Sequence, residues 1–249
     1  MAVPSKWALF AQRSARVAKD QVAAVLRMDP GYTHAPPKAL FTFKNPADIA
    51  QYVVGSDADI GGYSSAKLEL DPQGHGRFFG DIRTEVRPQM QGKMRSGYAG
   101  FRNKMRPSLF GNVTDDLSLY KYLCLRVKAG GDPQTRNGYF VNVQTDGPIE
   151  TDLWQHRLYL RGNGHWEDVL VPLDKFILTN SGEAVNSNMA MMSESIKSIG
   201  ISLLGGNANI QGKFELGIEY IGATTDANNL PSTTSTTTEE NAPPTASQV

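Results

Sequence analysis

Asp57 and Asp59 are two carboxylates that immediately precede the glycine pair Gly61-Gly62. Carboxylates in such a turn are candidate calcium ligands, but calcium prefers about six to eight oxygen ligands, and two side chains supply too few. Acidic turn residues also accept hydrogen bonds from local backbone N–H groups, and glycines there adopt positive φ angles. We therefore predict a structural turn and no metal site, with Arg102 as a candidate ion-pair partner of either aspartate inside the fold.

Catalytic motifs are missing from the sequence. It contains no Gly-x-Ser-x-Gly elbow, no P-loop and no dinucleotide-binding glycine motif. The four histidines lack the spacing of metal ligands. Glu150 and Asp152 are carboxylates of the kind that flank a sugar in glycosidases, but nothing places them at a catalytic separation. We predict no catalytic residue and no cofactor, and a protein that is not an enzyme.

Aromatic side chains leave a binding function open. Sugar-binding sites combine exposed aromatic platforms with surrounding polar groups. Trp154 and Tyr159 are the candidates for such a platform here. A lectin-like or lipid-headgroup-binding module is therefore one interpretation of the chain.

The elements that would position these side chains are strands. Short runs alternate between apolar and polar residues and are separated by Gly, Asn and Asp, as in Tyr139, Val141 and Val143. Strands at this spacing without helical crossovers predict an all-β fold, a jelly-roll β-sandwich, rather than an α/β sheet. A short helix is expected near 45–51. The predicted strands are 39–43, 63–70, 76–87, 96–104, 119–128, 138–145, 156–161, 165–172, 196–204 and 212–221.

Composition excludes several classes of protein. The 249 residues are 40% hydrophobic, which is enough for one core of all-β size, and the formal net charge is zero. Nucleic-acid binders usually carry a basic excess, so no nucleic-acid partner is predicted. No apolar run approaches the ~20 residues of a membrane-spanning helix. Cys124 lies in an apolar run, which predicts a buried, inert thiol.

Residues 1–30 form a basic amphipathic helix in our prediction. On a helical wheel, Trp7, Phe10, Val22 and Val25 lie on the apolar side. Three interpretations stay open: a helix on an anionic membrane surface, a mitochondrial targeting helix, or a helix packed on the sandwich. The predicted membrane-surface residues are Trp7, Phe10, Arg13, Arg16, Lys19, Val22, Val25 and Arg27.

A second basic segment runs from Arg83 to Arg106, and methionines are interleaved with its charges. It is either a set of solvated charges on strand edges and loops, or a contact surface for lipid headgroups or an acidic partner. Methionine suits the second interpretation because its flexible side chain adapts to irregular partners. The predicted surface consists of Arg83, Arg87, Met90, Lys93, Met94, Arg95, Lys104, Met105 and Arg106.

The segment His165–Phe176 carries the most specific pattern. Trp166, Val169 and Val171 fit a half-buried strand, Pro172 ends it, and Phe176 closes the unit. With its flanks, this segment resembles the tryptophan–valine–proline–phenylalanine segment of the CIA30 family, the complex I intermediate-associated proteins. Motifs in the same order elsewhere support the resemblance over roughly 41–222: Phe41-Thr42-Phe43, Asp57 to Ser64, Phe78-Phe79-Gly80, Ser96 to Arg102, Ile199-Gly200-Ile201 and Gly212 to Leu216.

The resemblance implies a fold and a function. The family domain is similar to galactose-binding and carbohydrate-binding jelly rolls. The resemblance implies an assembly factor that binds a membrane-arm intermediate of respiratory complex I. Its implied partners also include other assembly factors. The implied location is the mitochondrial matrix, peripheral on the inner membrane. Loops at Gly147–Leu153 and Gly182–Ser193 depart from the family pattern, so loop functions are not transferred.

Three parts of the chain follow from these observations. Residues 1–30 are the basic helix, and residues 39–223 are the CIA30-type jelly-roll domain. Residues 224–249 are rich in Ser, Thr and Pro and have almost no large apolar side chain. Such a segment cannot bury enough surface to offset the entropy of ordering, so we predict a disordered tail.

Overall fold

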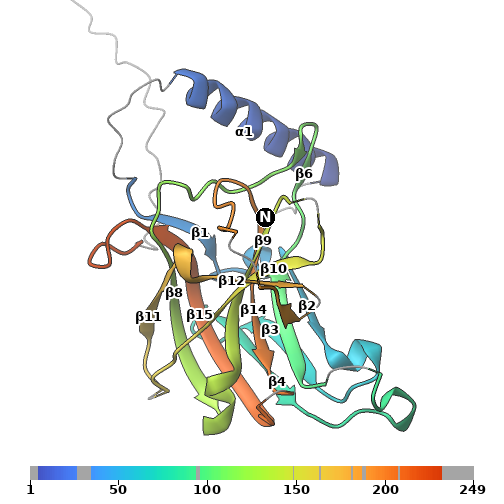
Figure 1. Cartoon of the computed structure of the whole chain (residues 1–249). Coiled ribbons are helices and arrows are strands. Elements are labelled where there is room, and N and C mark those ends of the chain that lie inside the picture. The colour runs from blue at the N-terminus through green and yellow to red at the C-terminus, as the bar shows by residue number, and fades with distance from the viewer. Residues whose placement is uncertain are drawn as a thin grey trace, which may run out of the picture.

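The structure, a computed structural model, describes residues 5–26, 35–93, 96–147, 149–162, 164–180, 182–186, 189–206 and 208–231, with only the backbone for 20–26. Two antiparallel sheets pack face to face, and helix α1 (Lys6–Leu26) lies across one end of the sandwich (Figure 1). The predicted two-sheet β-sandwich is confirmed. Within the described ranges, no helix combines the length and apolar character needed to cross a bilayer.

The six-stranded sheet is built around one long strand, β15 (Gly212–Thr224). β15 pairs with β8 along one edge, and its other edge pairs first with β4 and then with β1. A register shift between Ile218 and Tyr220 marks the bulge where the partner changes. The other strands are β1 (Lys38–Thr42), β3 (Ser65–Leu70), β4 (Gly76–Ile82), β8 (Tyr122–Gly131) and β11 (Glu167–Pro172).

The seven-stranded sheet has the order β13-β12-β10-β9-β14-β5-β2. Its strands are β2 (Tyr52–Ser56), β5 (Tyr98–Asn103), β9 (Tyr139–Thr145), β10 (Asp152–Arg157), β12 (Ile177–Asn180), β13 (Glu183–Ala184) and β14 (Ile196–Leu204). A hairpin of β6 (Pro107–Ser108) and β7 (Gly111–Asn112) stands apart and contacts α1. The short helices are α2 (Pro46–Ile49), η1 (Asp57–Ile60), η2 (Pro88–Met90), η3 (Pro133–Gly138) and η4 (Leu173–Lys175).

The core fills the space between the sheets with the inward side chains of alternating strands. Phe78 lies at its centre, with its ring 5.0 Å from those of Phe101 and Phe214. Tyr139, Val141 and Val143 of β9 are fully buried, as the alternation predicted. Burying one such side chain contributes about 1.5–3 kcal/mol, so a core of this kind holds both sheets in a fixed relation.

Most predicted strands are present, but one is displaced and several short ones were not predicted. The strand expected at 156–161 is β10, which begins at Asp152 and ends at Arg157. β2, β12 and the two-residue strands β6, β7 and β13 were not predicted. The expected short helix is α2, whose N-cap Asn45 accepts a 3.0 Å hydrogen bond from the Asp48 N–H.

Candidate functional site

An open groove of about 670 Å³ lies at one edge of the sandwich, between the start of β8 and the segment that follows β11. Pro172 ends β11 opposite Tyr122, and η4 then turns the chain back toward the core. The Leu173 N–H donates to the Lys121 carbonyl at 2.9 Å, which fixes this turn against β8. The turn therefore brings Leu173 and Phe176 to the floor of the groove.

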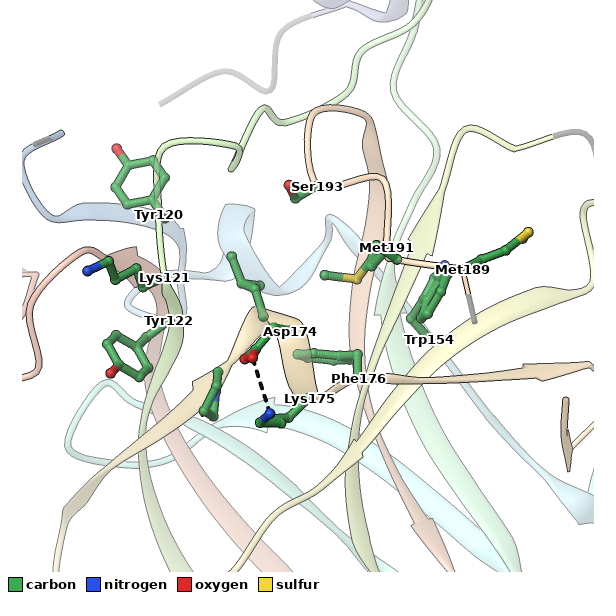
Figure 2. A pocket seen from close by; sticks show the side chains of 13 residues that line it. Tyr120, Lys121, Tyr122, Trp154, Asp174, Lys175, Phe176, Met189, Met191 and Ser193 are labelled. Carbon is green, nitrogen blue, oxygen red and sulfur yellow. Dashed lines mark ion pairs between the residues drawn. The ribbon is translucent and has the colours of Figure 1, made fainter. Parts of the chain in front are cut away.

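The groove has an apolar floor and a mixed rim (Figure 2). Trp154 and Phe176 are almost fully buried, and Met191 lies beside them. Met189 is 63% exposed at the rim. Figure 2 shows Tyr120, Lys121 and Tyr122 on the opposite side of the hollow. This arrangement suits a bulky apolar side chain whose neighbours reach polar groups at the rim.

Charged groups of the groove are confined to its rim. Lys175 and Asp174 form an exposed ion pair of 3.2 Å, and Lys121 is exposed as well. The Tyr120 hydroxyl donates to the Pro36 carbonyl at 3.2 Å. Burial, assisted by the Asp116 charge, raises the pKa of Tyr120, so its phenol stays protonated. The residues lining the groove include no histidine or cysteine.

The wall formed by Met189 and Met191 belongs to the Gly182–Ser193 loop, one of the two departures from the family pattern. Its C-terminal end is anchored, because the Leu117 N–H donates to the Ser193 carbonyl at 2.8 Å. Asp115 and Ile196 exchange backbone hydrogen bonds of 2.8 and 3.0 Å just beyond it. Sequence reasoning missed this groove, although three methionines close together in one loop were a usable signal.

Asp57 has a structural role, because its side chain joins two segments of the chain through hydrogen bonds. Its buried carboxylate accepts from the Ser64 N–H at 2.9 Å, the Ser64 hydroxyl at 3.1 Å and the Gly97 N–H at 2.6 Å. Gly61 has φ 113°, as the turn prediction required. At Gly62 the reason is space, because a Cβ there would lie 2.3 Å from Cγ of Asp57. The described residues contain no cluster of three potential metal ligands.

Arg102 does not pair with either aspartate. Its side chain is exposed on the outer face of β5, and the Asp57 carboxylate faces Ser64 and Gly97 instead. The predicted ion pair inside the fold is therefore wrong. It failed because alternation along β5 directs Phe101 inward and Arg102 outward.

The two aromatic residues of the predicted sugar platform differ in exposure, so they do not form one surface. Trp154 is only 6% exposed because its ring faces inward from β10. Tyr159 is 73% exposed, with the Arg157 guanidinium 6.0 Å from its ring centroid. Cys124 is fully buried, as predicted, and burial raises the pKa of its thiol to about 12.

Helix α1 presents a different face to the hairpin than the helical wheel predicted. Ser14 is buried, its hydroxyl accepts from the Leu109 N–H at 3.1 Å, and Arg13 and Phe10 are half-buried beside it. Trp7 is 81% exposed, and Arg16 and Lys19 are exposed. The side chains of Val22 and Val25, and the whole of Arg27, lie outside the described residues. Packing on the hairpin therefore accounts for the burial of one side of the helix, whereas the side that carries Trp7 stays exposed.

The second basic segment is divided between opposite ends of β5. Arg83, Arg87, Met90 and Lys93 precede the strand, while Lys104, Met105 and Arg106 follow it. Two of these cations are paired: Arg83 with Asp81 at 2.7 Å, and Arg106 with Asp115 at 2.6 Å. Met90 packs beneath Gly61. Met94 and Arg95 lie outside the described residues. The described residues of this segment therefore lie on both sides of β5 in the chain, and a shared contact surface stays a prediction.

Comparison with known proteins gives consistent matches. A family model described as complex I intermediate-associated protein 30 (CIA30) matches residues 41–218. "Complex I intermediate-associated protein 30, mitochondrial" of Neurospora crassa is 33% identical over 214 residues, which cover 76% of this chain and 74% of the relative. The protein of the same name from Drosophila melanogaster is 31% identical over 203 residues, covering 80% of this chain and 65% of the relative.

Among solved structures, the family 11 carbohydrate-binding module of a cellulosomal cellulase of Clostridium thermocellum has a TM-score of 0.50 with this chain. The sequences are 14% identical, and the match covers 77% of this chain and 96% of the module. At this identity the likeness is one of fold alone. It agrees with the predicted likeness to carbohydrate-binding domains.

Proposed function

The chain belongs to the complex I intermediate-associated protein 30 family, and on that premise we propose that it is a non-enzymatic assembly factor that binds a membrane-arm intermediate of respiratory complex I. Family membership implies the role in complex I assembly. The relatives named above are mitochondrial proteins, which supports a location in the matrix, on the inner membrane. The match over residues 41–218 is the observation that carries this proposal.

The groove beside Trp154 and Phe176 is our proposed contact for the intermediate. An unfinished membrane-arm surface is apolar, and a factor that covers it needs an adaptable apolar site with a polar rim. Aromatic and methionine side chains are enriched at such contacts because they bury large areas and adjust to the partner. A native subunit that buries more surface would then displace the factor.

The helix end of the sandwich is our proposed contact with the membrane. Trp7 is exposed on α1, and Leu109 and Phe110 are 73% and 59% exposed at the tip of the adjoining hairpin. Exposed Lys6, together with Lys104 after β5, adds positive charge to this end. Apolar side chains beside cations suit the surface of an anionic bilayer. The cations at the other end of β5, such as Arg87 and Lys93, remain a proposed contact with an acidic partner.

Native-gel separation of mitochondrial membranes, with and without this protein, tests the assembly role. We expect mature complex I to disappear and a membrane-arm subcomplex to accumulate, with this protein co-migrating in cells that contain it. Normal complex I in its absence would overturn the proposal.

A pair of matched variants in one loop tests the groove. Met189→Asp places a charge at the apolar rim, and Met192→Asp places it on a neighbouring residue that is 45% exposed and does not line the groove. Both should fold, because both side chains are exposed. We expect only Met189→Asp to lose co-migration with the subcomplex; equal behaviour of the two variants would exclude the groove.

A further inference from the structure

A second groove, lined by both apolar and polar residues, crosses the outer face of the seven-stranded sheet. It has a volume of about 180 Å³, and its floor is the backbone at Gly55, Gly100 and Gly200. These glycines come from neighbouring strands, because Gly55 pairs with Gly100, and Gly200 pairs with Arg102. Gly55 and Gly100 lie opposite each other and Gly200 lies beside them on the next strand, so the missing side chains leave a hollow in which a ligand can approach the sheet.

Tyr98 supplies an aromatic surface in this hollow. A Cβ at Gly100 would lie 2.7 Å from the Tyr98 hydroxyl oxygen and 3.1 Å from its Cζ, so the ring lies over the glycine. The side chain is nevertheless 42% exposed. Burial raises the pKa of Tyr98 despite the Arg102 charge, which keeps its phenol neutral. A neutral aromatic ring held against the sheet is a preorganised stacking surface.

Asn142 lines the groove on its β9 side, and a chain of uncharged polar groups continues from it to Gln155 and Ser202 beside the groove. Gln155 donates to the Asn142 side-chain oxygen at 2.8 Å, and Asn142 donates to the Ser202 hydroxyl at 2.9 Å. Each amide has two N–H groups and one oxygen with two acceptor sites, so both keep capacity for a ligand. Among the described residues, the Gln155 oxygen accepts no hydrogen bond, and Arg102 forms no ion pair.

These groups select among ligand classes. A nucleic acid needs several cations, whereas Arg102 is the one cation among the residues that line the groove. A peptide that extends the sheet needs a free strand edge, whereas β5, β14 and β9 are paired on both sides. Sugar hydroxyls both donate and accept, as amides do, and sugar rings stack on aromatic faces.

We propose that this groove is a binding site for a carbohydrate chain. The row of paired positions from Arg102 through Gly200 and Asn142 to Gln155 spans three strand spacings, about 14 Å, which suits an oligosaccharide better than a single ring. Tyr98 stacks against one ring, and the amides of Asn142 and Gln155 bind hydroxyls of the chain. This site is independent of the assembly role, because the two grooves share no lining residue. They meet only on strand β10, where Leu153 lines this groove and Trp154 lines the edge groove.

Titration of the full chain with cellotetraose, laminaritetraose, maltotetraose and chitotetraose, followed by ¹H–¹⁵N NMR, tests the proposal. We expect at least one of them to shift the side-chain amide signals of Asn142 and Gln155. Tyr98→Ala should weaken that binding about tenfold. Gln155→Leu keeps similar volume and should also weaken it, which covers the case in which Tyr98→Ala does not fold.

Tyr63→Ala is the matched control, because Tyr63 is 54% exposed and does not line the groove. Its binding should equal that of the unmodified chain. The proposal is overturned if none of the four sugars shifts these amides up to about 10 mM, or if Tyr98→Ala and Gln155→Leu both bind as tightly as Tyr63→Ala. Either result leaves the native-gel test of complex I assembly unaffected.

Discussion

The two outer faces of the sandwich differ in how they use polar side chains. On the six-stranded sheet, Arg126 pairs with Asp168 at 2.6 Å and with Glu219 at 3.1 Å. Asp168 also accepts from the Tyr220 hydroxyl at 3.0 Å. Farther along, Lys128 lies 5.3 Å from the Trp166 ring. The polar groups of this face are largely engaged with one another.

The seven-stranded sheet instead presents amides, hydroxyls and bare backbone. Asn142 and Gln155 bond to each other but keep unused donors and acceptors, and the Arg102 guanidinium lacks an acid partner in the described part of the chain. A face whose groups satisfy one another stabilises the fold, whereas a face with spare capacity can bind a ligand. The comparison therefore assigns stability to one sheet and recognition to the other.

Thiol labelling gives the largest expected difference between the faces. Cys124 lies on β8, and raising its pKa from 9.0 to about 12 lowers the thiolate fraction about a thousandfold at neutral pH. We expect N-ethylmaleimide to modify Cys124 at least that much more slowly than Tyr98→Cys in a Cys124→Ser background, measured by intact mass. Equal rates would show that Cys124 on the six-stranded sheet is as accessible to the reagent as position 98 on the seven-stranded sheet. Because the folded pKa is raised, this thiol's contribution to stability is lost as pH rises from about 9 toward 12.

The next difference is in the free energy of unfolding. Arg126→Met removes one cation from two half-buried carboxylates, so we expect a loss of about 2 kcal/mol in urea unfolding. Arg102→Met is the matched change on the other face and should cost less than about 0.5 kcal/mol. Similar losses for both variants would contradict the assignment of stability to one sheet.

A double-mutant cycle examines the seven-stranded face at finer scale. Gly100→Ala should cost about 1 kcal/mol, because the new methyl group displaces the Tyr98 ring. In a Tyr98→Ala background that contact is absent, so the same change should cost about 0.5 kcal/mol less. Additive losses in urea unfolding would mean that the ring does not lie over Gly100.

Strands with strict alternation were predictable from the sequence. β9 follows its pattern because it buries one face against the opposite sheet. β15 follows it from Phe214 to Ile218, where the bulge ends the alternation. β10 was misplaced because Leu158 and Leu160 prolong an alternating pattern beyond the strand end at Arg157. β2 and β12 escaped because strands of five and four residues are too short for periodicity to identify.

Neither groove was predictable, because each is assembled from distant segments. The edge groove needs Tyr122, Trp154, Phe176 and Met191 to meet, and only sheet order brings them together. The same limit applies to the segment His165–Phe176, whose sequence pattern did not say which residues face the core. Val171 enters the core as predicted, but Trp166 packs on the outer face over Gly217, between His75 and Lys128.

The smallest expected effect concerns a more exposed ion pair on the outer face of the six-stranded sheet. Arg77 contacts Glu215 at 2.7 Å and lies 4.2 Å from the Phe79 ring centroid, but both charged side chains are about two-fifths exposed. Solvent screens such a pair, so Arg77→Met should cost about 0.5 kcal/mol, and 1 M salt should remove most of that difference. The Arg126→Met loss should persist in the same salt, because its partners are more buried. If salt abolished both losses equally, the Arg126 ion pairs would be screened by solvent as strongly as the Arg77 pair. The contribution of this face to stability would then come from its apolar side chains alone.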